Sequence, residues 1–405
     1  MPEYKWPGVY VEEVSSGIQP IAGIGTSTAA FIGISQEIIG PWDPAKKQGM
    51  PVNPAGDAYE QKPADIPQPV NSWTEFTQKF GDIQEANEFL AQAVFGFFNN
   101  GGLRCWVIRV AADGNVVKVL PRLESIDEIV IVAAPLPPSA TQETLHDIQD
   151  KLVKHCQDME TRTAVLDSAR DIDDDNLVIT ENDTGIWRPT INKKGYGAFY
   201  FPWIYVADPI RGGRVAVPPS GHVTGIYARS DAERGVQKAP ANEIILGALD
   251  LRYQLSNITQ GDLNLRGVDC IRSFSGTIKV YGARTLASDP EHGDIEWQYV
   301  SVRRLVNFLR GSIETGTQWV VFEPNAQDLW AKIRRNVGAF LYGQWAAGAL
   351  VGNTPEQAFY VRCDESTNPP DVRALGRVVT EIGVAVVRPA EFVVFRLSQW
   401  SGPAQ

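Results

Sequence analysis

The chain contains 405 residues, of which 43% are hydrophobic and 21% charged, and it carries a formal net charge of -11 at pH 7. This is the composition of a folded globular protein large enough for two domains, and its acidity argues against nucleic acid as a partner because a polyanion would be repelled. No apolar run approaches the roughly 20 residues that span a bilayer, and residues 1–6 lack the features of a signal peptide, so we expect a protein made in the cytoplasm without direct membrane insertion.

The N-terminal segment predicts a strand outside the main fold. Residues 6–8, Trp-Pro-Gly, break any helix, and a β-prone run follows over residues 9–14. The apolar side chains of this predicted arm are Val9, Tyr10, Val11 and Val14. A second apolar run, 29–34, predicts another strand, and the Pro- and Gly-rich stretch 40–69 predicts a long surface loop.

Helix and strand signals then alternate. Asp82 and Glu85 resemble a capping box and predict a helix that ends at the glycines 101–102. The run 105–110 predicts a strand, and 129–134 predicts another that is apolar on both faces. A strand of that kind is expected in a parallel sheet that is buried on both sides.

A β-α-β unit is completed by the next segment. Ser139 and Gln142 form a second capping-box pattern before a helix, and residues 163–166 predict the strand that follows it. The run 198–206 would extend the sheet, with Pro202 indicating an edge or a bulge. The first large domain is therefore expected to be α/β.

From about Trp297 the pattern changes to two amphipathic helices, the second beginning near Asn325. This second helix carries a basic cluster outside its apolar stripe, formed by Lys332, Arg334 and Arg335. In an acidic protein such a cluster is a candidate contact for an acidic partner, and a solvated helix face is the alternative.

The C-terminal region predicts a strand over residues 378–387, a stop at Pro389 and a final β-prone run. The apolar residues of this last run are Phe392, Val393, Val394, Phe395 and Leu397. Because successive side chains of a strand point to opposite faces, a free arm of this kind would expose apolar surface on both.

Two patterns in the sequence resemble sites of chemistry. The glycines and hydroxyls of residues 23–28 resemble a phosphate loop, but they precede a strand rather than follow one. Asp167, Ser220 and His222 could form a hydrolase triad, yet the sequence around Ser220 has neither a G-x-S-x-G elbow nor the pattern of a serine that opens a helix. We therefore predict no catalytic residue.

Cysteines and histidines do not predict a metal or cofactor site. The four cysteines, Cys105, Cys156, Cys270 and Cys363, are far apart in sequence and are expected to be reduced core residues. His146 and His155 are too far apart on one helix to ligate one ion.

Several stretches in chain order resemble the contractile tail sheath family. The strongest covers Phe201-Pro202-Trp203, Val217-Pro218-Pro219-Ser220-Gly221-His222 and the residues up to Asn242. The others are 7–13, 28–33, 96–102, 107–110, 281–286, 302–305, 322–325 and 389–392. Gln237 and Tyr281 depart from the pattern, since the family usually has Trp at both positions.

The resemblance implies a structural protein rather than an enzyme. The expected fold is an outer α/β domain (21–290), subtilisin-like but non-catalytic, and a smaller α+β inner domain (291–390) that faces a rigid tube. Residues 1–20 and 391–405 would be strand-exchange arms that join sheets of neighbouring subunits by β-augmentation, although both could instead pair within their own chain.

The implied function is a helical sheath that contracts around an inner tube and drives it through a target envelope. The implied partners are further copies of the chain in hexameric rings, an inner tube protein, and baseplate and terminator or cap proteins, within a phage tail or tail-like particle assembled in the bacterial cytoplasm. Two alternatives remain open, namely a hydrolase with a Ser/His/Asp site and a passive shell-forming lattice protein.

Overall fold

A computed structural model of the chain describes residues 20–36, 39–43, 48–51, 64–172 and 188–394. The chain divides into two compact units. The larger unit contains Ile24–Arg310 and Val387–Gln405, and the smaller unit contains Met1–Gly23 and Gly311–Val386. The chain leaves the larger unit within helix α7 (Val300–Gly316) and returns to it at Val387.

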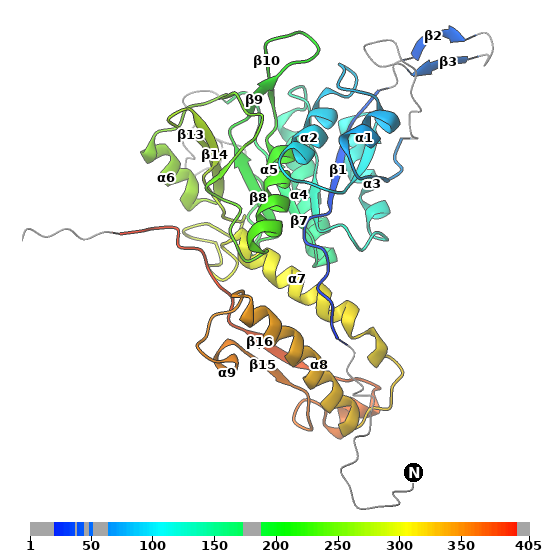
Figure 1. Cartoon of the computed structure of the whole chain (residues 1–405), viewed down its shortest axis with the longest axis vertical. Helices are drawn as coiled ribbons and strands as arrows, with labels where there is room; N and C mark the ends of the chain where they lie inside the picture. The colour runs from blue at the N-terminus through cyan, green and yellow to red at the C-terminus, as the bar shows by residue number, and fades with distance from the viewer. Residues whose placement is uncertain (1–19, 37–38, 44–47, 52–63, 173–187, 395–405) are drawn as a thin grey trace, which may run out of the picture. The chain divides into compact units, whose positions relative to one another are not determined.

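The larger unit is organised around a nine-stranded sheet with the order β11-β14-β13-β8-β7-β6-β1-β5-β4 (Figure 1). Neighbouring strands from β13 to β5 are parallel, whereas β4, β14 and β11 add antiparallel edges. The strands are β1 (Ala29–Ile34), β4 (Gln68–Val70), β5 (Cys105–Val110), β6 (Ile131–Ala133), β7 (Thr163–Asp167), β8 (Gly197–Phe201), β11 (Glu243–Ile244), β13 (Val268–Phe274) and β14 (Thr277–Val280).

The parallel strands are apolar on both faces because helices cover both. Phe31 of β1 belongs to one core cluster and its neighbour Ile32 to the other, and both are fully buried. One cluster includes residues of α1 (Trp73–Phe80), α2 (Glu88–Asn99) and α5 (Ser220–Arg234). The other includes residues of α3 (Val116–Leu123), α4 (Gln142–Met159) and α6 (Asn257–Leu265).

Helices α2 and α5 pack at very close range, which two glycines make possible. A Cβ at Gly221 would lie 2.3 Å from the backbone of Ala93, and one at Gly225 would lie 2.4 Å from the carbonyl oxygen of Phe97. The glycines of the motif around Ser220 therefore serve helix packing.

The predicted strands over 29–34, 105–110 and 163–166 are confirmed, and the buried parallel strand within 129–134 is confirmed in shorter form as β6. The prediction of a continuous surface loop over 40–69 is wrong. Strands β2 (Ile39–Asp43) and β3 (Gln48–Pro51) pair with each other, and β4 extends the large sheet.

Neither predicted capping box caps its helix, because both helices begin further along the chain than expected. Helix α2 begins at Glu88, and Asp82 instead accepts a hydrogen bond from the backbone of Ile83. Helix α4 is capped by Thr141, whose hydroxyl accepts from the backbone of Thr144 at 3.2 Å, and not by Ser139. The short α1, capped by Ser72, was not predicted.

The predicted strand 198–206 is divided in two at Pro202. Strand β8 ends at Phe201 and lies inside the large sheet, whereas β9 (Ile204–Ala207) joins a separate three-stranded sheet with β10 (Arg214–Val217) and β12 (Asp250–Leu251). Proline has no N–H for a ladder, so the chain changes sheet here. Pro202 thus marks a break rather than an edge or a bulge.

The smaller unit is built on the second half of α7 and on α8 (Gln327–Ala346), both of which were predicted. The short helices α9 (Pro355–Ala358) and α10 (Pro370–Ala374) flank strand β15 (Phe359–Arg362), and strand β16 (Glu381–Val384) follows them. Strand β16 lies within the predicted run 378–387. It pairs with β15 in an antiparallel two-stranded sheet. The buried side of α8 consists of Leu329, Trp330, Ile333, Asn336, Val337, Phe340 and Leu341.

Candidate functional site

Asp167, Ser220 and His222, the possible hydrolase triad, do lie in one region of the larger unit. Asp167 is the last residue of β7, and Ser220 is the first residue of α5, so the expectation that this serine does not open a helix is wrong. The backbone N–H of Ser220 donates to Asp167 Oδ1 at 2.7 Å. The carboxylate therefore caps the amino end of α5 instead of orienting a histidine.

The electrostatics of these residues oppose triad chemistry. Asp167 is 5% exposed and burial raises its pKa to about 7, while His222 is 1% exposed and burial lowers its pKa to about 4. Within the described residues, His222 Nδ1 has no hydrogen-bond partner. The His222 ring instead packs against Gly96, where a Cβ would lie 2.4 Å from it.

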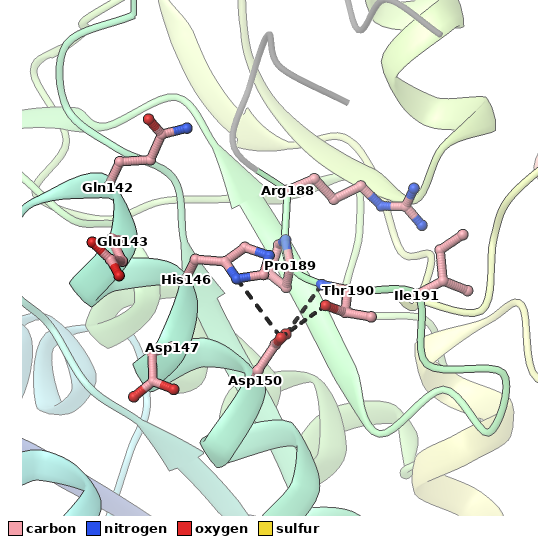
Figure 2. A pocket seen from close by; sticks show the side chains of 9 residues that line it. All are labelled: Gln142, Glu143, His146, Asp147, Asp150, Arg188, Pro189, Thr190 and Ile191. Carbon is pink, nitrogen blue, oxygen red and sulfur yellow. Dashed lines mark hydrogen bonds and ion pairs between the residues drawn. The ribbon is translucent and has the colours of Figure 1, made fainter. Parts of the chain in front are cut away.

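A hollow lies on the surface beside α4. It measures about 760 Å³ and lies between α4 and residues 188–191 (Figure 2). Asp150 accepts hydrogen bonds from the hydroxyl and backbone N–H of Thr190 at 2.7 and 3.1 Å, and its carboxylate lies 3.7 Å from His146 Nδ1. Asp150 thus holds the chain at Thr190.

Other features considered in the sequence have structural roles. Residues 23–28 lead into β1, as the sequence indicated, so they do not open a helix toward a phosphate. The four cysteines are buried and free, as expected. Across the ranges that the structure describes, no group of three His, Cys, Asp or Glu side chains could hold a metal ion, and no helix there has the length and apolarity to cross a membrane.

In the described part of the C-terminal segment, residues 387–394, the side-chain hydrogen bonds are those of Glu391. Its carboxylate accepts from Arg284 Nε and Nη2 at 2.8 and 2.7 Å, from Asn264 Nδ2 at 2.6 Å and from Tyr299 Oη at 3.0 Å. Although burial acts to raise it, the hydrogen bonds from Arg284 and Asn264 hold the pKa of Glu391 below its ordinary value. Glu391 is therefore an anionic anchor paired with a nearly buried arginine.

The residues after this anchor are exposed. Phe392, Val393 and Val394 are 72%, 69% and 78% exposed and form no strand. The remaining predicted arm residues, Val9, Tyr10, Val11, Val14, Phe395 and Leu397, lie outside the described residues. Three successive large apolar side chains in solvent indicate a surface that a partner covers.

Strands β15 and β16 form a sheet in the smaller unit whose outer edges have no strand partner among the described residues. Apart from an isolated bridge between Leu350 and Val386, each strand pairs only with the other in the described part of the chain. Tyr360 is 54% exposed and its ring covers Gly383, its cross-strand partner. A two-stranded sheet with so little burial is marginal alone and offers backbone groups to additional strands.

The predicted basic cluster lies on α8, but its three side chains differ in exposure. Lys332 and Arg335 are exposed, whereas Arg334 is half-buried and donates to the carbonyl oxygen of Cys363. Arg334 therefore also fixes α8 to the end of β15 within its own chain.

The Glu391 anchor was missed by sequence reasoning. Glu391 and Arg284 both lie in stretches that carry the family resemblance, 389–392 and 281–286, and this was the available signal. Opposite charges 107 residues apart cannot be paired from sequence alone, because the pairing depends on where the chain returns to the larger unit.

Comparisons with known proteins agree with this architecture. Residues 125–286 match the family described as the phage tail sheath protein central domain, and residues 293–399 match the phage tail sheath C-terminal domain. A putative prophage major tail sheath protein of Pseudomonas aeruginosa is 26% identical over 49% of this chain and 51% of its own length. The tail sheath protein of Enterobacteria phage T4 is 24% identical over 44% of this chain and 26% of its own length. The chain thus spans about half or less of these curated relatives.

Solved structures match almost the whole chain. The contracted helical sheath of the anti-feeding prophage has a TM-score of 0.74 and 26% identity over 97% of this chain and 99% of that one. The contracted PVC sheath of an extracellular contractile injection system has a TM-score of 0.72 and 26% identity, with 99% of both chains covered. A sheath tail protein of Listeria innocua, at 9% identity and a TM-score of 0.56, shares the fold. The chain belongs to the phage tail sheath protein family.

Proposed function

We propose that this chain is the structural subunit of a contractile sheath, which polymerises helically around an inner tube and shortens to drive that tube through a target envelope. The observation that carries this proposal is the similarity over 97–99% of the chain to two sheaths in the contracted state. The subunit acts mechanically, and the cap that Asp167 forms on α5 is consistent with a fold that does not use a Ser/His/Asp site.

Polymerisation proceeds by exchange of terminal strands. Phe392, Val393 and Val394 expose apolar side chains at the start of the arm 391–405, and residues 1–20 supply a second β-prone arm. The outer edges of β15 and β16 are suited to accept such strands from neighbouring copies, because added strands would satisfy their backbone groups and cover Tyr360. Hexameric rings would then connect into a continuous lattice.

The two parts of the chain take different positions in this lattice. The α/β part, 21–290, forms the outer, subtilisin-like and non-catalytic domain, and residues 291–390 form the inner domain that faces the tube. The exposed Lys332 and Arg335 of α8, together with Arg334, contact an acidic tube surface. Baseplate and cap proteins lie at the two ends of the polymer. The particle is assembled in the bacterial cytoplasm.

Contraction needs no nucleotide if the contracted lattice has the lower free energy. The tube and baseplate would hold the extended state, and strand-linked subunits would move together as rigid bodies. A difference of about 1.4 kcal/mol per subunit biases each subunit tenfold, so a long sheath commits collectively.

The test is to express the chain with and without an inner tube protein and to measure the rise and diameter of any polymer by electron cryomicroscopy. We expect a short, wide lattice from the chain alone and a long, narrow one around the tube. Identical narrow lattices in both samples would contradict the stored-energy mechanism, and a closed shell would favour a passive lattice protein.

A further inference from the structure

Residues 387–394 reconnect the C-terminal segment to the larger unit through very few bonds. Within the described chain these residues make no backbone hydrogen bond, so the segment is not held as a strand or a helix. Their hydrogen bonds are those of the Glu391 carboxylate, which accepts from Arg284, Asn264 and Tyr299. In the described part of the arm, hydrogen bonding to the larger unit is therefore concentrated at one side chain.

The receiving end of this attachment is rigid. Arg284 is 5% exposed, its backbone N–H donates to Asp269 Oδ1 at 2.7 Å, and its Nη1 donates to the carbonyl oxygen of Asn264 at 3.2 Å. Asp269 is fully buried in β13, which pairs with β8 in the parallel core of the large sheet. A continuous path of polar contacts thus connects Glu391 to the central sheet.

The boundary between held and free residues is abrupt. The Glu391 side chain is 19% exposed, whereas the next residue, Phe392, is 72% exposed. Any pull on residues 392–405 reaches Glu391 before it reaches another bonded group of the described segment.

We propose that Glu391 is the mechanical anchor of the C-terminal arm: its ion pair with Arg284 transfers tension from the strand exchanged with a neighbour into the large sheet of its own subunit. This inference rests on the proposed strand-exchange function and adds the site at which the mesh is fastened. Glu391 acts as a positioning residue, because it fixes where the arm leaves the fold and does not itself contact the neighbour's sheet.

The test compares the full chain with Glu391→Gln, which removes the charge and places an amide against the guanidinium. The matched control is Glu128→Gln, because Glu128 also accepts two hydrogen bonds from an arginine, Arg104, in the larger unit but far along the chain from either arm. Tyr299→Phe removes a single donor and serves as a milder second variant.

Three measurements are made on each protein. Polymer length is measured by electron microscopy before and after shear, and monomer folding is measured by thermal melting. A spin label at Ala390→Cys reports the mobility of the arm base, and its selective attachment is feasible because the four native cysteines are buried.

We expect Glu391→Gln to leave the monomer folded with a lowered melting temperature, because the nearly buried Arg284 loses its counter-charge. We also expect it to increase label mobility and to shorten sheared polymers about threefold or more, with Tyr299→Phe intermediate and Glu128→Gln unchanged. Normal polymers with an immobile label in Glu391→Gln would overturn the anchor while leaving the sheath function intact. Failure of the unmodified chain to polymerise would instead count against the proposed function. If Glu391→Gln does not fold, an unchanged length and label in Tyr299→Phe overturns the anchor.

Discussion

Strand β1 and the β15–β16 pair show two opposite ways of placing apolar strands in one chain. β1 is bonded on both edges, to β5 and β6, and is buried on both faces by helices of the same unit. β15 and β16 bond to each other and leave Tyr360 exposed. A strand completed by its own chain stabilises the subunit, whereas one left incomplete is suited to joining subunits.

Removing the arms tests whether strands from neighbouring subunits complete β15 and β16, and the largest effect is expected here. Deleting residues 1–14, or residues 392–405 with Glu391 retained, should leave folded monomers or short oligomers, because each deletion removes the strands that would complete β15 and β16 in a neighbour. Sedimentation velocity and circular dichroism give size and folding. Normal tubes from both truncated chains would show that the sheets are completed in some other way.

A pair of phenylalanine substitutions separates subunit stability from assembly. Phe31→Ala empties a fully buried site in β1 and should lower the free energy of unfolding of the monomer by about 3–5 kcal/mol. Phe392→Ala, at a 72% exposed position, should change it by less than about 0.5 kcal/mol and shorten the polymers. Denaturant unfolding measures the free energy of unfolding, and microscopy measures polymer length. A large loss of monomer stability in Phe392→Ala, with little loss in Phe31→Ala, would refute the distinction.

The buried carboxyl of Asp167 should make the larger unit pH-dependent. Its pKa is raised to about 7 in the folded chain from an ordinary 3.8, so the folded state binds the proton more tightly. The stability that this proton contributes is present below about pH 4 and is lost as the pH rises through about 7, at about 1.4 kcal/mol per unit of pKa.

The measurement is the free energy of unfolding from pH 4 to 8 in the unmodified chain and in Asp167→Asn. The variant should gain stability relative to the unmodified chain as the pH rises, since its amide does not ionise. Asp158→Asn, an exposed position, controls for the loss of one carboxylate. Parallel pH profiles for the unmodified chain and Asp167→Asn would show that Asp167 is not the responsible group.

The smallest effect is expected at the basic cluster of α8. Reversing the exposed Lys332 and Arg335 to Glu should reduce co-sedimentation with an acidic tube a few-fold at low salt and less at high salt, because screening weakens contacts between exposed charges. Arg334→Glu also breaks a bond to Cys363 and should destabilise the monomer as well. Equal tube binding by the double variant at all salt concentrations would assign the cluster to a solvated face.

The local sequence pattern was sufficient to predict the elements whose burial follows a regular pattern along their length. Continuous apolar runs predicted β1, β5 and β6 because a strand covered by helices on both sides must be apolar on both faces. Helical spacing of apolar residues predicted α7 and α8, because an amphipathic helix buries one face and leaves the other polar. The order of the motifs along the chain indicated the family. A short motif can be recognised from its own residues, whatever its position in the folded structure.

The tertiary structure alone decided the pairings between distant residues. Arg304 of α7 is 4% exposed and pairs with Asp231 of α5 at 2.5 Å, a partner 73 residues away along the chain. Pro202 divided a run that reads as one strand, because the next residues bond to a different sheet. Glu391 became an anchor only where the returning chain meets Arg284, since ion pairing depends on distance in space and the sequence records only distance along the chain.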